Sequence, residues 1–317
     1  MGVQNAATRQ YMENRDIFAD LCNYYIYDGK PVVQPEQLRP LDGTELTILE
    51  QRNGNLKEKL KQRDLLMSVS AMTDETTAYM IVGVENQSKV HYAMPVRNML
   101  YDASRYNQQV RMLSKELTTN QADSSSAAFL SGGSKNIKLL PLVTLVVYFG
   151  TDPWDGPRSL HEMLHVEHEE ILQYAADYKL QLIAPYHLSD EDLEKFQSNL
   201  KEVLSFIKYE KDKDKISDLM QRDAFKALDK DAAMVLNTCT RLKLPIEDYE
   251  EMGEVNMCQA WEEIKEDCRI EGRQEGRWES RKELAAQLMK DNIYPLSRIS
   301  ELTELPMAEL EALQQTV

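Results

Sequence analysis

The chain has 317 residues, of which 42% are hydrophobic and 28% charged, and its formal net charge at pH 7 is −16. This composition is typical of a globular protein with one large domain and an appendage, or with two modest domains. The excess of acidic residues argues against a protein that coats nucleic acid without specificity, because phosphate binding requires Lys and Arg. A specific nucleic-acid site stays open, since a local basic surface suffices for it.

The sequence predicts a reduced, cytoplasmic protein without membrane contact. The longest apolar run, at 140–149, is too short to cross a bilayer. The N-terminal segment is polar and lacks the apolar stretch of a signal peptide. The four cysteines are scattered at spacings that fit neither a zinc site nor a disulfide framework, as expected in a reducing compartment.

The first elements predicted along the chain are a helix and a β-hairpin. Apolar residues at helical spacing predict a helix over 8–26, and the Pro- and Gly-rich segment 27–43 predicts a loop. A strand is expected at 64–72 and a returning strand at 78–87, joined by a polar turn within 73–77. We therefore expect an antiparallel pair of strands early in the sheet.

A second helix and two further strands are predicted next. Helical spacing of apolar residues predicts a helix over 93–117, with Pro95 in its first turn, and the small, polar residues of 122–136 predict a loop. The run at 140–149 is continuously apolar and rich in β-branched residues, which is typical of a central strand covered on both faces. The alternation at 178–184 indicates a half-buried strand.

The rest of the chain is predicted to be helical. A helix over 189–209 begins with Ser189 as its N-cap, and one or two helices follow within 215–242. The charged segment 261–290 is either a long helix or a solvated linker, and 294–315 predicts a small helical hairpin. The hairpin is poor in basic residues, which favours packing or dimerisation over DNA reading and makes a homodimer one expected state.

The order of these elements predicts an α/β core with an α-helical C-terminal extension. We divide the chain into a core over 8–210, a helical extension over 211–260, and a charged helix with a small helical hairpin over 261–317.

Glu85, Asn86 and Gln87 form a polar end to the apolar strand at 78–87. Side chains alternate along a strand, so Glu85 and Gln87 point to one face and Asn86 to the other. A two-residue turn before this strand places Asp64 opposite Glu85, whereas a five-residue loop places Asp64 opposite Asn86. The hairpin geometry thus indicates, without deciding it, a pair of carboxylates on neighbouring strands.

Two carboxylates on neighbouring strands repel each other unless a cation lies between them. Mg²⁺ (or Mn²⁺) suits Asp64 and Glu85, because it prefers oxygen ligands and leaves positions for water and phosphate. The backbone carbonyl of Asn86 could supply a third protein oxygen, and Gln87 could orient an attacking water. Such a metal lowers the pKa of a bound water and offsets the charge that grows on phosphate oxygens.

Basic residues flank the two acids on both sides, which favours a phosphate substrate. They are Arg52, Lys57, Lys59, Lys61 and Arg63 before the hairpin, and Lys89, His91, Arg97, Arg105 and Arg111 after it. The alternative is an ordinary hairpin with exposed acids at its strand ends and with the basic residues in surface ion pairs.

The run IVGVENQSKVHYAMPVRNMLYD, residues 81–102, resembles the Rpn family of recombination-promoting nucleases, which are also labelled transposases and belong to the PD-(D/E)XK superfamily. The resemblance extends to FADLCN, RDLL, LPLVTLVVYFGTDPWDGPRSLHEML and LSDEDLEKFQSNLKEVLSFIKY, and covers roughly the first two-thirds of the chain. It implies a restriction-endonuclease-like core, in which helices flank a central mixed sheet. It also implies Mg²⁺-dependent cleavage of DNA in recombination or in mobile-element processing.

The resemblance assigns roles to individual residues. Asp64 matches the strand aspartate of the family, and Glu85 and Gln87 match its Glu-x-Gln, which implies that these three are catalytic and that the acids bind metal. Asp20, in the first predicted helix, matches an accessory acid.

The superfamily pattern ends in Lys, where this chain has Gln87. A neutral amide cannot replace the charge of an ammonium group at the transition state. Lys89, Arg97 or Arg63 could supply that charge, and we expect these three and Tyr101 to bind substrate. The alternative is a catalytically weak or inactive DNA-binding or interaction protein on a nuclease-like core.

The segment His161-Glu162-Met163-Leu164-His165 is a literal HExxH motif. On a helix, His161 and His165 share a face and can bind Zn²⁺, with Glu162 as general base and His168 as a third ligand. The motif stands near the expected start of a helix and lacks the further pattern of the metzincins. A zinc metalloprotease is therefore the third hypothesis, beside the interpretation of this stretch as a solvated helix face.

Overall fold

The computed structural model describes residues 3–50, 56–73, 76–119, 138–242, 253–291 and 293–314. The chain divides into two compact units, Met1–Asn256 and Met257–Val317, and each has its own apolar core. None of the helices in the described ranges combines the length and the apolar character that crossing a membrane requires.

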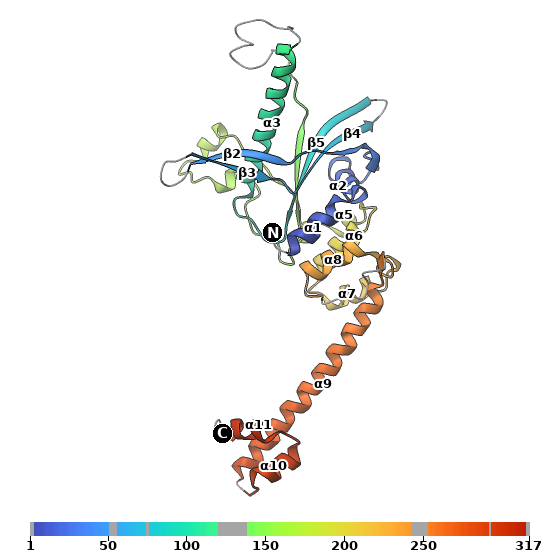
Figure 1. Cartoon of the computed structure of the whole chain (residues 1–317), viewed down its shortest axis with the longest axis vertical. Helices are drawn as coiled ribbons and strands as arrows, with labels where there is room; N and C mark the ends of the chain where they lie inside the picture. The colour runs from blue at the N-terminus through green and yellow to red at the C-terminus, as the bar shows by residue number, and fades with distance from the viewer. Residues whose placement is uncertain are drawn as a thin grey trace. The chain divides into compact units, whose positions relative to one another are not determined.

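The first unit is built on a five-stranded mixed sheet with the order β1-β4-β5-β6-β7 (Figure 1). The strands are β1 (Leu38–Pro40), β4 (Leu65–Thr73), β5 (Thr76–Gln87), β6 (Leu142–Tyr148) and β7 (Gln181–Ile183). The pairs β1–β4 and β4–β5 are antiparallel, whereas β5–β6 and β6–β7 are parallel. This mixed sheet, with helices around it and a helical C-terminal region after it, is the α/β fold class expected from the sequence.

Helices cover both faces of this sheet. Figure 1 shows α3 (Met94–Thr119) on one side, and α1 (Val3–Glu13) and α2 (Arg15–Tyr27) on the other. The core on the α3 side includes Met94, Val146, Tyr148 and Trp154, with the Tyr148 and Trp154 rings in edge contact at 5.3 Å. The β6 strand is buried from Thr144 onward, which confirms the prediction of a central strand covered on both faces.

The described part of the first unit contains four further α-helices. They are α5 (Asp190–Leu193), α6 (Leu200–Tyr209), α7 (Lys213–Leu219) and α8 (Lys230–Cys239). Short 3₁₀ helices cover η1 (Pro35–Gln37), η2 (His161–Met163), η3 (Glu169–Tyr174), η4 (Pro185–His187) and η5 (Asp223–Phe225). Two small sheets pair β2 (Thr44–Glu50) with β3 (Leu56–Gln62) and β8 (Leu228–Asp229) with β9 (Glu254–Val255).

The β4–β5 hairpin has the register of a two-residue connection. Leu65 pairs with Val84 at one end of the ladder and Thr73 pairs with Thr76 at the other. This register confirms the alternative that places Asp64 opposite Glu85, and the five-residue loop is wrong.

Two helix predictions need correction, and one loop prediction falls outside the described residues. The predicted helix 8–26 is two helices, because Asn14 adopts extended backbone and its side chain caps α2 by accepting from Asp16 N at 2.9 Å. The predicted helix 189–209 is also two, α5 and α6, although Ser189 is its N-cap as expected. The loop predicted at 122–136 lies outside the described residues.

Strands also occur where the sequence predicted none. The segment 27–43, predicted as a loop, contains η1 and β1. The hairpin of β2 and β3 was not predicted, because its second strand, LKEKLKQ, has a charged residue at most positions and lacks the apolar content of a buried strand.

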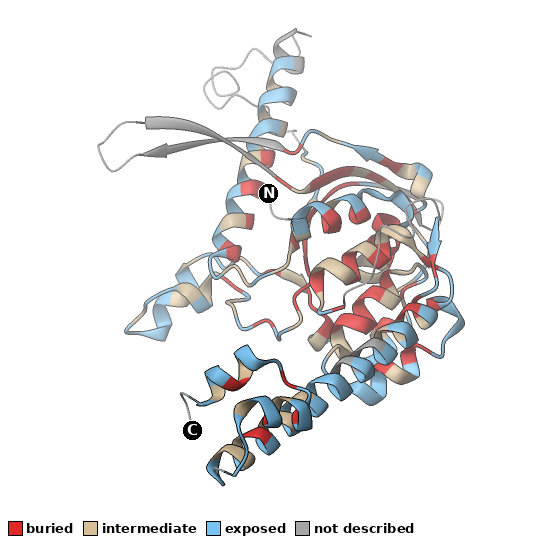
Figure 2. Ribbon diagram, turned by 60° about the horizontal axis from the view of Figure 1, so that its bottom comes forward, coloured by how far each residue is buried: buried red, intermediate tan, exposed pale blue. Residues whose placement is uncertain are grey.

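The second unit is helical throughout its described part. It consists of α9 (Met257–Lys290), α10 (Leu296–Thr303) and α11 (Met307–Gln314). A small core of Ala285, Ile299, Leu305 and Leu310 joins the three helices. Figure 2 shows α9 exposed along much of its length. The charged segment is thus a long helix, and the predicted helical hairpin is confirmed as a packing element on it.

Candidate functional site

Two acids meet where β4 begins and β5 ends. Asp64 directly precedes β4, and the hairpin register places it opposite Glu85. The carboxylate of Asp64 accepts a hydrogen bond at Oδ2 from the backbone N–H of Asn86, over 2.8 Å. This bond fixes the Asp64 carboxylate against the end of the β5 strand, next to the side chain of Glu85.

Glu85 is fully buried, and only one of its carboxylate oxygens has a partner. Oε2 accepts from Nη2 of Arg97 on α3 at 2.9 Å, while the buried Oε1 has no hydrogen-bond partner. Arg97 also donates from Nε to the hydroxyl oxygen of Tyr101, one helical turn further on, at 3.3 Å. A buried carboxyl oxygen without a partner is costly, so this arrangement needs a function or a missing ligand to explain it.

The two acids both hold protons more tightly than ordinary carboxyl groups. Burial, helped by the charge of Asp64, raises the pKa of the Glu85 carboxyl to about 8, although Arg97 and Arg63 act to lower it. Burial also raises the pKa of Asp64, against the opposing effects of the Asn86 N–H and of Arg97. Paired acids with raised pKa values are typical of functional sites, and a cation between them relieves the same repulsion.

Arg63 lies next to Asp64 in sequence but is enclosed in the core. Its Nη1 donates to Thr144 Oγ1 at 2.6 Å and its Nη2 to Asp102 Oδ1 at 2.5 Å, with none of its side chain exposed. The hydroxyl of Tyr178 donates to the other oxygen of Asp102. A guanidinium enclosed in this way cannot reach a DNA phosphate, which corrects the expectation that Arg63 binds substrate and gives it a structural role.

Tyr101 links this buried network to the acid pair. Its ring lies beneath the guanidinium of Arg63, at 5.1 Å from the ring centroid, and beneath that of Arg97, at 5.5 Å. Because Arg63 is held by Asp102, it supports the ring that in turn supports Arg97. Sequence reasoning missed Asp102 and Thr144, and the one signal for them was the small polar side chain of Thr144 within the apolar run at 140–149.

The remaining expected residues lie at the same strand end. Gln87 is half-buried on the same face of β5 as Glu85, and its carbonyl accepts from Phe149 N at 2.8 Å. Lys89 is exposed just beyond the strand. The structure therefore brings Asp64, Glu85, Arg97 and Tyr101 together, and Gln87 and Lys89 lie at the same end of β5.

A family model described as "Putative transposase, YhgA-like" matches residues 35–234 of the chain. The match spans more than half of the chain and includes the whole acid pair with α3. The chain belongs to this family. The family is part of a group of nuclease-like transposases, the Rpn and PD-(D/E)XK group, as the sequence resemblance indicated. No curated protein and no solved structure matches the chain.

The region matched by the transposase family begins after Asp20, the expected accessory acid. The carboxylate of Asp20 accepts from Gln197 N at 3.0 Å, and from Ser198 at the backbone N (2.8 Å) and at Oγ (2.5 Å). These bonds hold the chain between α5 and α6, and they explain why the predicted helix is interrupted there. None of them involves Asp64 or Glu85, so Asp20 is a structural carboxylate in this arrangement.

The HExxH segment lies within the transposase match but does not form an α-helix. The backbone before it pairs with the chain around Lys179, and after η2 Leu164 returns to extended backbone. The Nε2 atom of His161 lies 2.8 Å from the carbonyl oxygen of Ala175. The prediction that His161, His165 and His168 share one face of a helix is therefore wrong. The pairing of Ser159 with Lys179 holds the preceding backbone in an extended conformation.

The basic zone predicted around the acids lies partly outside the described residues. Arg52 belongs to that part, as do the side chains of Lys57, Lys59 and Lys61. Arg105 is buried and contacts Gln108 and the carbonyl of Asp42, whereas Arg111 is exposed on α3.

The acid pair can be completed as a magnesium site by a backbone oxygen. In the described part of the chain, no group of three or more His, Cys, Asp or Glu side chains is placed to hold a metal. The N–H of Asn86 points to Asp64, and the carbonyl of a strand residue points to the same edge as its N–H. Two carboxylates, one with an unpartnered oxygen, and a carbonyl are the ligand set that Mg²⁺ prefers.

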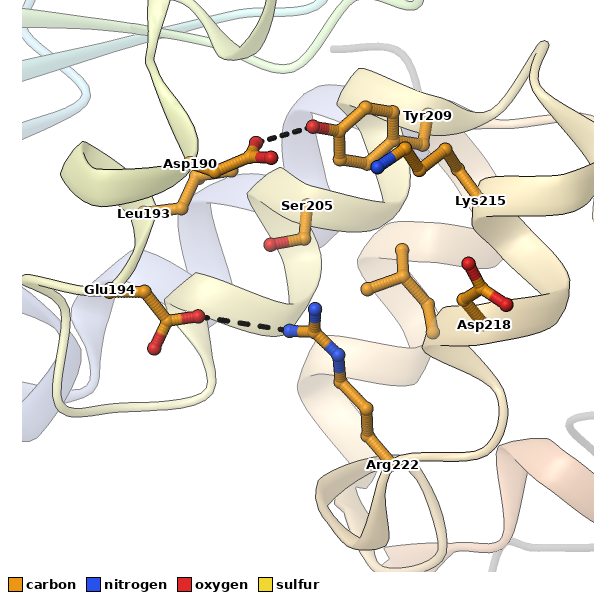
Figure 3. A pocket seen from close by; sticks show the side chains of 9 residues that line it. Asp190, Leu193, Glu194, Ser205, Tyr209, Lys215, Asp218 and Arg222 are labelled. Carbon is orange, nitrogen blue, oxygen red and sulfur yellow. Dashed lines mark hydrogen bonds and ion pairs between the residues drawn. The ribbon is translucent and has the colours of Figure 1, made fainter.

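A surface cavity elsewhere in the first unit contains none of these residues. It has a volume of about 100 Å³ and lies between α5, α6 and α7 (Figure 3). Two of its acids are paired: Asp190 contacts Lys208 and Tyr209, and Glu194 contacts Lys201 and Arg222. The acid pair, and not this cavity, is the candidate site.

Proposed function

We propose that the chain is a Mg²⁺-dependent DNA endonuclease that hydrolyses phosphodiester bonds during recombination or the processing of mobile DNA. The observation that supports this most is the pair of the half-buried Asp64 and the buried Glu85, which has an unpartnered carboxylate oxygen. Membership of a transposase family supports DNA as the substrate.

Asp64, Glu85 and the carbonyl of Asn86 would hold Mg²⁺ (or Mn²⁺) at the end of β5. When bound there, the cation lowers the pKa of a water and offsets charge on the phosphate oxygens. Gln87 lies on the same strand face as Glu85, so its amide would accept from the attacking water and orient it toward the phosphorus.

Lys89 and Arg97 would supply positive charge for the transition state. Gln87 supplies none, because its amide is neutral at every accessible pH. Lys89 is exposed next to the strand end and Arg97 reaches the site from α3, so both would contact phosphate oxygens. Tyr101 positions Arg97 through its hydroxyl and its ring.

A second candidate function is DNA binding with weak or no catalysis. It is favoured by Gln87 at the position of the superfamily lysine, and by the absence of a third acid beside the pair among the described residues. This candidate uses the same surface for DNA and differs in predicting no bond cleavage.

A plasmid assay separates the two. Supercoiled plasmid is incubated with the full chain and Mg²⁺ at low salt, which favours DNA binding by an acidic protein. The endonuclease proposal expects nicked or linear DNA from wild type and at least about a hundred-fold less from Asp64→Asn or Glu85→Gln. The matched control, Asp152→Asn, changes an exposed acid paired with Lys211 and keeps full activity. Intact plasmid with all four proteins supports the binding function instead.

Two further expectations from the sequence stay predictions. A cytoplasmic location is the compartment in which such an enzyme meets chromosomal or mobile DNA. A homodimer through the C-terminal hairpin would let two sites act on two strands, and sedimentation of the full chain measures it.

A further inference from the structure

Arg97 forms an ion pair with Glu85 from the side of α3. Its Nη2 lies 2.9 Å from Glu85 Oε2, and 26% of the Arg97 side chain is exposed while that of Glu85 is fully buried. The guanidinium therefore reaches the carboxylate from the solvent side and partly covers it.

Arg97 contacts the acid pair through a single carboxylate oxygen. Arg97 brings a single positive charge to two carboxylates and bonds only one oxygen of Glu85, leaving Oε1 buried without a partner. A divalent cation supplies twice the charge and coordinates carboxylate oxygens directly. Such a cation and Arg97 therefore compete for the same carboxylate.

We propose that Arg97 has two alternative partners: the Glu85 carboxylate while the acid pair holds no divalent cation, and a DNA phosphate once the cation has taken its place. This inference rests on the cation site of the proposed function. Arg97 therefore pairs with Glu85 in the cation-free protein and contacts the substrate in the cation-bound protein.

The contacts around Arg97 allow this exchange. Apart from Glu85, its polar anchor is the hydroxyl of Tyr101, at the long distance of 3.3 Å. Tyr101 itself is held on its other side by Arg63, whose guanidinium is locked by Asp102. The ring therefore stays in place when the end of Arg97 turns away from Glu85.

A released Arg97 would remain at the entrance to the acid pair. Its backbone is fixed in the first turns of α3, and its planar fork of N–H groups matches the oxygens of a phosphate. The exchange thus couples occupation of the cation site to DNA binding, with each favouring the other.

Chemical labelling of arginine measures the exchange without relying on cleavage. The full-length protein is treated briefly with phenylglyoxal, and each arginine is quantified by mass spectrometry with and without Mg²⁺. Arg111, exposed on the same helix, is the internal reference, and Arg63 is the buried one. We expect labelling of Arg97 to rise about five-fold with Mg²⁺ (about 1 kcal/mol) and to fall again when duplex DNA is added.

Two variants fix the interpretation. At pH 9, where the Glu85 carboxyl is ionised, Glu85→Gln removes the charge that holds Arg97, so its labelling is high with or without Mg²⁺. Asp64→Asn keeps the Arg97–Glu85 pair but weakens the cation site, so labelling stays low in both conditions.

The outcomes also separate this inference from the proposed function. Unchanged Arg97 labelling in a protein that nicks plasmid overturns the exchange and leaves the endonuclease intact. A rise with Mg²⁺ that DNA does not reverse overturns the phosphate contact. No rise together with no nicking overturns both proposals, because no cation then reaches the acid pair.

Discussion

Arg63 and Asp102 form an ion pair that joins the start of β4 to the middle of α3, with Nη2 and Oδ1 2.5 Å apart and the guanidinium completely buried. Thr144 accepts from Arg63 Nη1 and donates to Asp102 Oδ1, and the hydroxyl of Tyr178 donates to Asp102 Oδ2. Because Asp64 follows Arg63 directly, this pair fixes the backbone that presents the first acid of the site.

Removing one partner of this pair should destabilise the fold strongly. Asp102→Ala leaves a buried guanidinium without its counterion, and we expect a loss of about 3–5 kcal/mol in the free energy of unfolding, measured with urea. The exposed pair of Asp152 and Lys211 is the matched comparison, and Asp152→Ala should leave the urea midpoint unchanged. Equal effects of the two substitutions would contradict a structural role for the buried pair.

Gly83 should not tolerate a side chain, because it faces the same guanidinium. A Cβ atom at Gly83 would lie 2.4 Å from Arg63 Nη1, closer than atoms pack. We expect Gly83→Ala to lower the free energy of unfolding by about 1–3 kcal/mol and to reduce any nuclease activity.

Gly272 provides the control for that substitution. It lies in α9, and a Cβ atom there would meet nothing within 4 Å, so Gly272→Ala should stabilise by about 0.5–1 kcal/mol through helix propensity. If Gly83→Ala were also neutral or stabilising, the Arg63 side chain would be free to move, and the buried Arg63–Asp102 pair would not be rigid.

Stability should fall as pH rises through the range set by Glu85. Its pKa is raised from an ordinary value of 4.5 to about 8, so between these values the folded chain keeps a proton that the unfolded chain releases. The free energy of unfolding therefore decreases over this range, by at most roughly 1.4 kcal/mol per pH unit, and the decrease ends above pH 8.

Urea unfolding at pH 5 and pH 9 tests this in the absence of divalent cations. Glu85→Gln carries no titratable proton, so it should lose much less stability than wild type between the two pH values and should be the more stable protein at pH 9. Glu263→Gln, an exposed change in α9, should behave as wild type. A fall of the same size in Glu85→Gln and wild type would assign the pH dependence to other groups.

Asp20 should contribute to the stability of the fold and not to DNA cleavage. Its carboxylate accepts bonds from Gln197 and Ser198, and Asp20→Ala should cost about 2–4 kcal/mol by leaving those donors unsatisfied. The measurements are urea unfolding and plasmid cleavage per folded molecule. Loss of cleavage without loss of stability would restore Asp20 to the role of accessory acid.

Local patterns in the sequence were sufficient to predict the central strand, the helix α3 and the strand end that carries the two acids. They left two hairpin registers open, and only the observed pairing of Thr73 with Thr76 decides between them. The break at Asn14 could have been predicted, because Asn is a common N-cap residue. The apolar spacing on both sides of Asn14 instead led to the prediction of one continuous helix.

Other features could not be predicted because they depend on residues far apart in the sequence. The contacts of Arg63 with Asp102 and Thr144 span 39 and 81 residues, and no local spacing encodes them. The HExxH stretch follows a helical spacing, yet the pairing of Ser159 with Lys179 draws its backbone out of a helix. The hydrogen bond from Gln197 N to the Asp20 carboxylate likewise spans 177 residues.

The pairing of Thr73 with Thr76 has a consequence for how this family can vary. Inserting or deleting a single residue between them would shift β5 by one position against β4, and Asp64 would then face a neighbour of Glu85. The acids would be separated although both remained in the sequence, and an alignment would still show them as present. For relatives of this chain, the number of residues in that connection is therefore as informative about nuclease activity as the acids themselves.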